Sequence, residues 1–145
     1  MWNISQSCYG FGNTAIRCYP ECFSQGTADV VVVEGDMPNI FGHVLLCGGD
    51  DYFHVAGPGG TSVLTLSSLG YRVYLSNSGK QELTRHVLAI PNPLGAQQRL
   101  EYRIANPSWD YHRLTHNCSH FVRDILHAGG VSDAWFSRFP IFMKG

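Results

Sequence analysis

The first two thirds of the chain combine short β-branched runs with segments in which apolar and polar residues alternate. Residues 28–34 (ADVVVVE) form such a run and are predicted to be a strand. Residues 42–47 (GHVLLC) and 52–56 (YFHVA) flank a Gly- and Asp-rich reversal, which predicts a β-hairpin. The alternating segments 71–76 (YRVYLS) and 85–90 (RHVLAI) are predicted to be two further strands.

The last third of the chain carries helical patterns. Pro93 suits the first turn of a helix that we expect to cover residues 96–105. A second helix is predicted over residues 117–127, where apolar side chains recur at three- and four-residue spacing, and Gly129 and Gly130 end it.

The order of these elements predicts the fold class. Strands come before helices, which indicates an α+β fold with a largely antiparallel sheet packed against helices. A length of 145 residues is typical of a single domain, so we expect one domain over residues 1–145. The first quarter, rich in Gly, Cys, Ser and aromatic residues, is expected to be irregular structure covering the sheet.

Charge and hydropathy exclude two classes of partner. The net charge is −1, only 14% of residues are charged, and no Lys/Arg run is present, so nucleic acid is not an expected partner. The longest apolar run, near residues 29–34, has the length of a strand and is too short to span a membrane.

The N-terminus lacks a basic start followed by an apolar stretch, so no general secretory signal peptide is predicted. We expect the chain to be made in the cytoplasm and, if exported, to leave by a route that needs no such leader. A domain of a longer protein would have the same appearance.

Three of the five cysteines lie near the N-terminus, and the other two stand apart. Cys8, Cys18 and Cys22 lie close together but lack the spacing of a zinc site, and an N-terminal disulfide is the alternative in an oxidising compartment. Cys47 lies in a predicted strand. Cys118 remains as the thiol for chemistry.

Cys118 is predicted to lie in the first turn of the last helix. Backbone N–H groups and the helix dipole stabilise a thiolate at that position, and the same donors can hold an oxyanion. The alternative is that Cys118 is a small buried apolar residue with a structural role.

His43 and His54 are the candidate partners of this thiol. Counted outward from the hairpin turn they come out roughly opposite each other, so their rings could share a hydrogen bond. This pattern would supply a base and a group that orients it. The alternative is that one histidine caps a strand edge and the other is a hydrogen-bonded core residue.

The remaining histidines do not predict a metal site. His112 and His116 have helical spacing within a loop-like segment, and no HExxH pattern is present, so no metal and no cofactor are expected. His116 and His120 flank the thiol and suit local hydrogen bonding. His86 and His127 have no predicted role.

The segments YHRLTHNC and HNCSHF resemble the cysteine motif of the circularly permuted papain-like and NlpC-like hydrolases, among them the lecithin:retinol acyltransferase family and the PPPDE peptidases. GHVLLCGGDDYFHVAG is similar to their histidine hairpin. The resemblance implies a papain-like fold of permuted NlpC type, with Cys118 as nucleophile at a helix N-terminus. It also implies His43 as base and His54 as the orienting group, and Asn117 and Ser119 lie near the expected oxyanion.

The resemblance implies a cysteine amidase or peptidase. Its bacterial members suggest peptide or amide bonds of peptidoglycan as substrate, delivery as a toxin by an apparatus such as type VI secretion into a target-cell periplasm, and a cognate immunity protein. The same residues would serve a thiol acyltransferase, a phospholipase or an isopeptidase, although the segment FSRFPIFMKG is too short to span a bilayer, which disfavours a lipid substrate. A binding module with a structural Cys118 is the third hypothesis.

Overall fold

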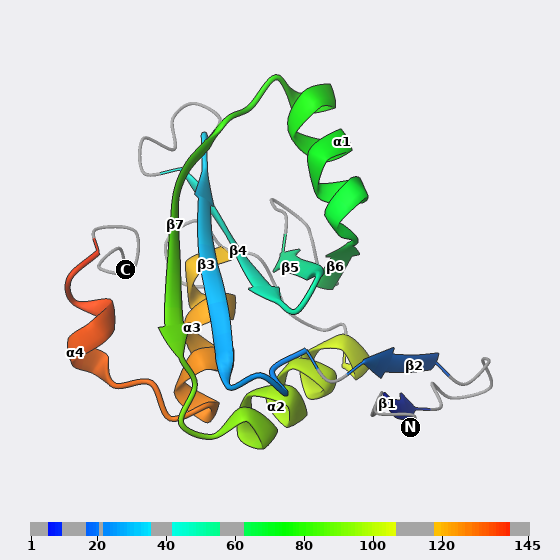
Figure 1. Ribbon diagram of the computed structural model, residues 1–145, viewed down its shortest axis with the longest axis vertical. Coiled ribbons are helices and arrows are strands. Elements are labelled where there is room, and N and C mark those ends of the chain that lie inside the picture. Colours follow the sequence, from blue (N-terminus) through cyan, green and yellow to red (C-terminus); the bar gives the residue numbers. More distant parts are fainter. Residues whose placement is uncertain are drawn as a thin grey trace.

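A computed structural model describes residues 22–35, 42–55, 63–106 and 118–139, together with the backbone of residues 6–9 and 17–20 (Figure 1). Its strands and helices, in chain order, are β1 (Gln6–Tyr9), β2 (Arg17–Pro20), β3 (Thr27–Val33), β4 (His43–Gly48), β5 (Asp51–Val55), β6 (Val63–Leu66), α1 (Ser68–Ser78), β7 (Glu82–Ala89), α2 (Pro93–Ala105), α3 (Cys118–Ala128) and α4 (Asp133–Phe136).

Five of the strands form one antiparallel sheet in the order β6-β5-β4-β3-β7. β3 and β4 lie at its centre, where Val31 is paired with Leu45 and both side chains are buried. A run of β-branched residues suits such a doubly covered strand. The expected α+β class with an antiparallel sheet is therefore confirmed.

The β4–β5 hairpin turns at Gly49 and Asp50, directly after Gly48, which still pairs with Asp51. Gly49 has a φ of +61°, a conformation that favours glycine. At Gly48 a Cβ atom would meet the Cβ of Cys22 at 2.7 Å and the Phe23 ring at 2.8 Å. The predicted hairpin is confirmed, and its first glycine is needed because the segment after β2 packs directly against it.

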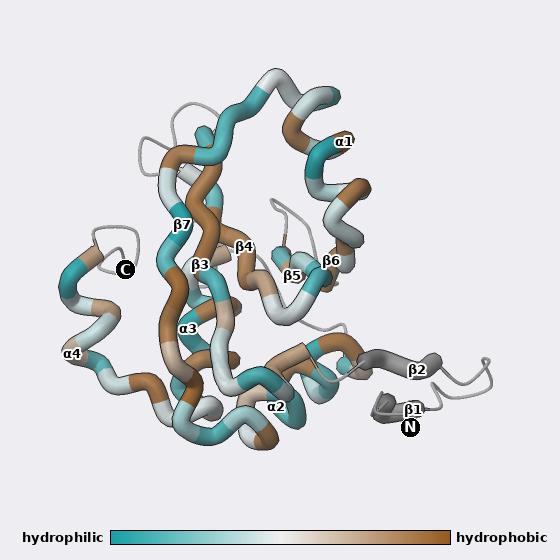
Figure 2. Tube along the Cα trace, viewed as in Figure 1, coloured by the Kyte–Doolittle hydropathy of each residue, from teal (hydrophilic) through white to brown (hydrophobic). Residues whose placement is uncertain are grey.

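The two faces of the sheet carry separate clusters of buried side chains. One cluster joins Val30, Val44 and Phe53 to residues of α2 and α3, and we call this side the α3 face. The other joins Val31, Val33, Leu45, Cys47 and Tyr52 to Tyr71 of α1, and we call this side the α1 face. Figure 1 shows α1 on one side of the sheet and α2 and α3 on the other, and Figure 2 shows that β3 and β4 are the most continuously apolar strands between them.

The strand predicted over residues 71–76 is wrong, because this segment belongs to helix α1. Tyr71, Tyr74 and Leu75 recur at helical spacing and pack on the α1 face. Ser67 caps the helix by accepting a hydrogen bond from the N–H of Gly70, and Gly79 ends it with a φ of +65°. The residues of YRVYLS alternate as in a strand, but those that pack on the sheet recur with the period of a helix.

The two C-terminal helices agree with the prediction except at their starts. α2 begins at Pro93, three residues before the predicted helix, and Asn92 caps it. α3 is described from Cys118, and the predicted start at Asn117 lies outside the described residues. After α3, Gly130 adopts a φ of +88°, as expected for a residue that ends a helix.

Three features were not predicted. The first quarter contains the two-stranded ladder β1–β2 rather than irregular structure alone, and β6 and α4 were missed.

Within the described ranges, none of the helices combines the length and the apolar character needed to cross a bilayer.

Candidate active site

The structure brings His43 and His54 into direct contact. His43 is the first residue of β4 and His54 lies in β5. Their Nε2 and Nδ1 atoms, respectively, are 2.8 Å apart, and the rings meet edge to face at a centroid distance of 5.0 Å. Because Leu46 pairs with Phe53, continuing the register sets His54 opposite Leu45 and makes His43 a diagonal neighbour rather than a direct partner.

His54 is held as a neutral imidazole at neutral pH. Its side chain is only 3% exposed. Burial, with a smaller contribution from the positive charge of Lys80, lowers the pKa of His54 from 6.5 to about 4. The ring also contacts Tyr74 of α1 at a centroid distance of 5.5 Å. A neutral ring fixed in this way can orient His43 without carrying charge itself.

The hydrogen bond shows which ring nitrogen of each histidine faces the other ring. His43 uses Nε2 toward His54, so Nδ1 is the nitrogen with which His43 would accept a proton from a thiol. When His43 is the base, its Nε2–H donates to Nδ1 of His54. His54 then carries its own proton on Nε2.

Cys118 lies on the opposite face of the sheet from this pair. It is 3% exposed and belongs to the cluster of the α3 face. His43 pairs with Val33 on the α1 face, and His54 shares the parity of Tyr52 on that same face. The structure therefore joins the two histidines, and the approach of Cys118 to them stays a prediction.

His43 is the first residue of β4 and therefore lies at one end of that strand. It is half-buried, and β4 is the middle strand of the sheet, between β3 and β5. Figure 1 shows the first end of α3 (gold) directed toward the half of the sheet in which β4 begins.

The neighbours of Cys118 have mixed placements. Ser119 is buried and His120 is half-buried. Asn117, His112 and His116 lie outside the described residues.

The two histidines without a predicted role have structural contacts. His86 packs against Phe139 at a centroid distance of 4.4 Å. His127 Nε2 lies 2.6 Å from an Asp133 carboxylate oxygen. These contacts attach α4 and the segment after it to the sheet and to α3.

A polar network on the α1 face was not foreseen from the sequence. Arg85 of β7 donates to Asp29 at 2.8 Å and to the Tyr52 hydroxyl at 2.7 Å. It also pairs with Glu82 at 2.9 Å, and its guanidinium lowers the pKa of Glu82. Tyr71 donates to Glu82 at 2.8 Å and stacks on Tyr52 at 4.0 Å. Charged residues within otherwise apolar strands were the only sequence signal for it.

The other buried thiols of the described chain are poor nucleophiles. Burial is the main cause that raises the pKa of Cys22 to about 12. Burial, followed by the Asp29 carboxylate, also raises the pKa of Cys47. Since the thiolate is the reactive form, neither residue suits chemistry at neutral pH.

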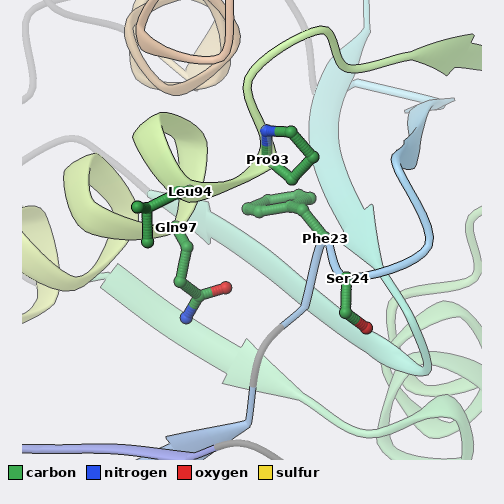
Figure 3. Close-up of a pocket in the computed structure, with 5 residues that line it drawn as sticks. All are labelled: Phe23, Ser24, Pro93, Leu94 and Gln97. Atoms are coloured by element: carbon green, nitrogen blue, oxygen red, sulfur yellow. The ribbon is translucent and has the colours of Figure 1, made fainter.

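A cavity of about 300 Å³ lies away from the candidate residues (Figure 3). The segment after β2 and the start of α2 line it with Phe23, Ser24, Pro93, Leu94 and Gln97. Gln97 accepts a hydrogen bond from the Cys22 N–H and donates to Glu101. Its polar groups are thus engaged in holding the segment after β2 against α2.

Within the part of the chain that the structure describes, no group of three or more His, Cys, Asp or Glu side chains is arranged to hold a metal ion. Comparisons of the chain with protein-family models, with curated proteins and with solved structures gave no match. The interpretation of the site rests on its residues and their geometry.

Proposed function

We propose that this chain is a cysteine hydrolase of the amidase or peptidase type, with Cys118 as nucleophile, His43 as base and His54 as the residue that positions the base. The observation that carries the proposal is the hydrogen bond between the two imidazoles, one of them buried and neutral. A base whose second nitrogen is held by a fixed partner is the arrangement that nucleophilic catalysis requires.

The reaction begins with proton transfer from Cys118 to Nδ1 of His43. The positive charge that forms on His43 is stabilised by its Nε2–H bond to His54. The thiolate attacks an amide carbonyl, and the backbone N–H of Cys118, at the N-terminus of α3, helps to hold the oxyanion. His43 then protonates the leaving amine, and water hydrolyses the thioester with His43 again as base.

The proposal requires Cys118 and His43 to meet at the start of β4. The thiol must turn from the α3 face toward the strand end, over a distance short enough for a hydrogen bond in the productive state. A papain-like fold of permuted NlpC type, in which the cysteine opens a helix beside a histidine strand, would provide this approach.

The substrate we propose is a peptide or amide bond of bacterial peptidoglycan. Its support is the resemblance of the segment around Cys118 to bacterial cysteine hydrolases. Such an enzyme would act as an antibacterial effector in a target-cell periplasm, and a cognate immunity protein would cover the site.

The direct experiment incubates purified sacculi with the protein and with Cys118→Ala, and identifies the released fragments by mass. We expect peptide fragments from the wild type and none from Cys118→Ala or His43→Ala. Cys47→Ala is the matched control, because it removes a different buried thiol, and it should retain activity. Release of fragments by Cys118→Ala would contradict the proposal.

Short-chain phospholipids and isopeptide-linked peptides are offered in parallel. Release of fatty acid would reassign the same residues to a phospholipase or acyltransferase, and cleavage of the isopeptide bond would identify an isopeptidase. Each outcome keeps the catalytic residues and changes the substrate.

A binding module without catalytic activity is the second candidate, and one observation favours it. Cys118 is buried within the apolar cluster of the α3 face, which is also the environment of a structural cysteine. In that case Cys118→Ala would leave the biological effect intact and lower the free energy of unfolding by about 1 kcal/mol.

A further inference from the structure

The backbone register of the N-terminal ladder sets two cysteines opposite each other. β1 and β2 pair antiparallel, with Cys8 as the partner of Cys18. The flanking pairs, Ser7 with Tyr19 and Tyr9 with Arg17, place the two cysteines inside the ladder rather than at its end. Directly opposed residues of an antiparallel pair have Cα atoms about 4.5–5.5 Å apart, whereas a disulfide spans about 4.4–6.8 Å.

Cys22 is not available to either cysteine. It is buried in the cluster of the α3 face and is in no disulfide, and its backbone N–H bonds to Gln97 of α2. A Cβ on Gly48 would meet the Cβ of Cys22 at 2.7 Å, so the hairpin turn closes over it. Burial raises its pKa to about 12, which suppresses the thiolate needed for disulfide exchange.

Of the three pairings that Cys8, Cys18 and Cys22 allow, the register thus selects one. We propose that Cys8 and Cys18 form a disulfide that links β1 to β2, while Cys22 and Cys47 remain thiols. Two thiols lose two protons and two electrons as the S–S bond forms, and a small-molecule disulfide such as oxidised glutathione accepts them and becomes two thiols. The bond is a modification site separate from Cys118.

This disulfide would form in an oxidising environment and would stabilise the N-terminal ladder there. A two-stranded ladder buries little apolar surface by itself and gains stability from a covalent link. The link is independent of the proposed hydrolase activity, because β1 and β2 lie outside the five-stranded sheet that carries His43 and His54.

Peptide mapping tests the pairing directly, because the sequence offers suitable cleavage sites. The native protein is equilibrated with oxidised glutathione, its remaining thiols are alkylated in denaturant, and it is digested with trypsin and a glutamate-specific protease. Cleavage after Arg17 and Glu21 leaves Cys8 in residues 1–17 and Cys18 in residues 18–21, separate from Cys22. We expect these two peptides as one linked species that reductant separates.

Two variants serve as controls. Cys18→Ser should abolish the linked species, and Cys22→Ala should leave it unchanged. Alkylated or glutathione-capped Cys8 and Cys18 in place of the link would overturn the proposal. A linked species that contains Cys22 would also overturn it.

Discussion

The two faces of the five-stranded sheet are built from different chemistry. On the α3 face, buried Val, Leu, Phe and Ile side chains join the sheet to α2 and α3. On the α1 face, apolar residues share the surface with two histidines, a stacked tyrosine pair and the Arg85 network. The α3 face provides stability through apolar burial, and the α1 face provides groups that titrate and exchange hydrogen bonds.

The helices reflect this difference. α3 is amphipathic and buries six of its residues, whereas only Tyr71 of α1 is fully buried, and Leu69 of α1 is 71% exposed. A weakly buried helix over a polar face is more easily displaced than the opposite layer. If the site opens to a substrate, we expect the α1 face to open.

The largest expected effect is on the α3 face. Phe121 is completely buried there, so Phe121→Ala should lower the free energy of unfolding by about 3–5 kcal/mol. Leu69→Ala on exposed α1 is the control and should change it by less than about 0.5 kcal/mol. Urea denaturation measures both, and similar losses for the two variants would erase the distinction between the faces.

Acid should destabilise the protein through the α1 face. His54 keeps its neutral form down to about pH 4, whereas the unfolded chain protonates it near pH 6.5. The unfolded state therefore binds more protons in this window, and stability falls as the pH drops from about 6.5 to 4, by at most roughly 3 kcal/mol.

His54→Gln removes this group and should flatten the stability profile in that window. The control His127→Gln, on the surface of α3, leaves His54 and its acid dependence in place. An unchanged profile in His54→Gln would mean that His54 is not held in its neutral form by burial.

The Arg85 network should contribute less, because its members are partly exposed. Arg85→Met leaves Asp29 and Glu82 without their common cation and should cost about 1–2 kcal/mol in unfolding free energy. Arg72→Met, on the exposed side of α1, is the matched control with an expected change near zero. Equal effects would reduce the network to ordinary surface charge.

The smallest expected effect is on the N-terminal cap of α1. The Ser67 hydroxyl accepts the Gly70 N–H at 3.0 Å, and Ser67→Ala should cost about 1 kcal/mol. Ser132 occupies the same cap position on α4 without a side-chain hydrogen bond, so Ser132→Ala should be nearly neutral. Thermal unfolding of the two variants compares them, and the reverse ranking would be inconsistent with this cap.

The sequence was informative wherever local pattern decides structure. The strand over residues 28–34 and the hairpin follow from β-branching and turn chemistry, and the hairpin alone suggested that His43 and His54 would meet. α1 was missed because six residues of YRVYLS satisfy a two-residue period, and only Ser67 and Gly79 at its ends mark a helix.

Other features depend on contacts that no local pattern contains. The Arg85 network joins residues up to 56 positions apart. The face on which a helix packs depends on the path of the connections before it, and an amphipathic helix fits either side of a sheet. The sequence therefore predicted Cys118 on a buried helical face beside His43, whereas the structure places Cys118 in the cluster of the α3 face.

The most direct test of the central claim measures how fast iodoacetamide alkylates Cys118 at neutral pH, with and without His43. We expect Cys118 to react faster than Cys22 and Cys47, and His43→Ala to slow its labelling by about tenfold or more, because the base that forms the thiolate is lost. Labelling of Cys118 no faster than that of Cys47, and unchanged in His43→Ala, would show that the sulfur and the imidazole pair do not work together.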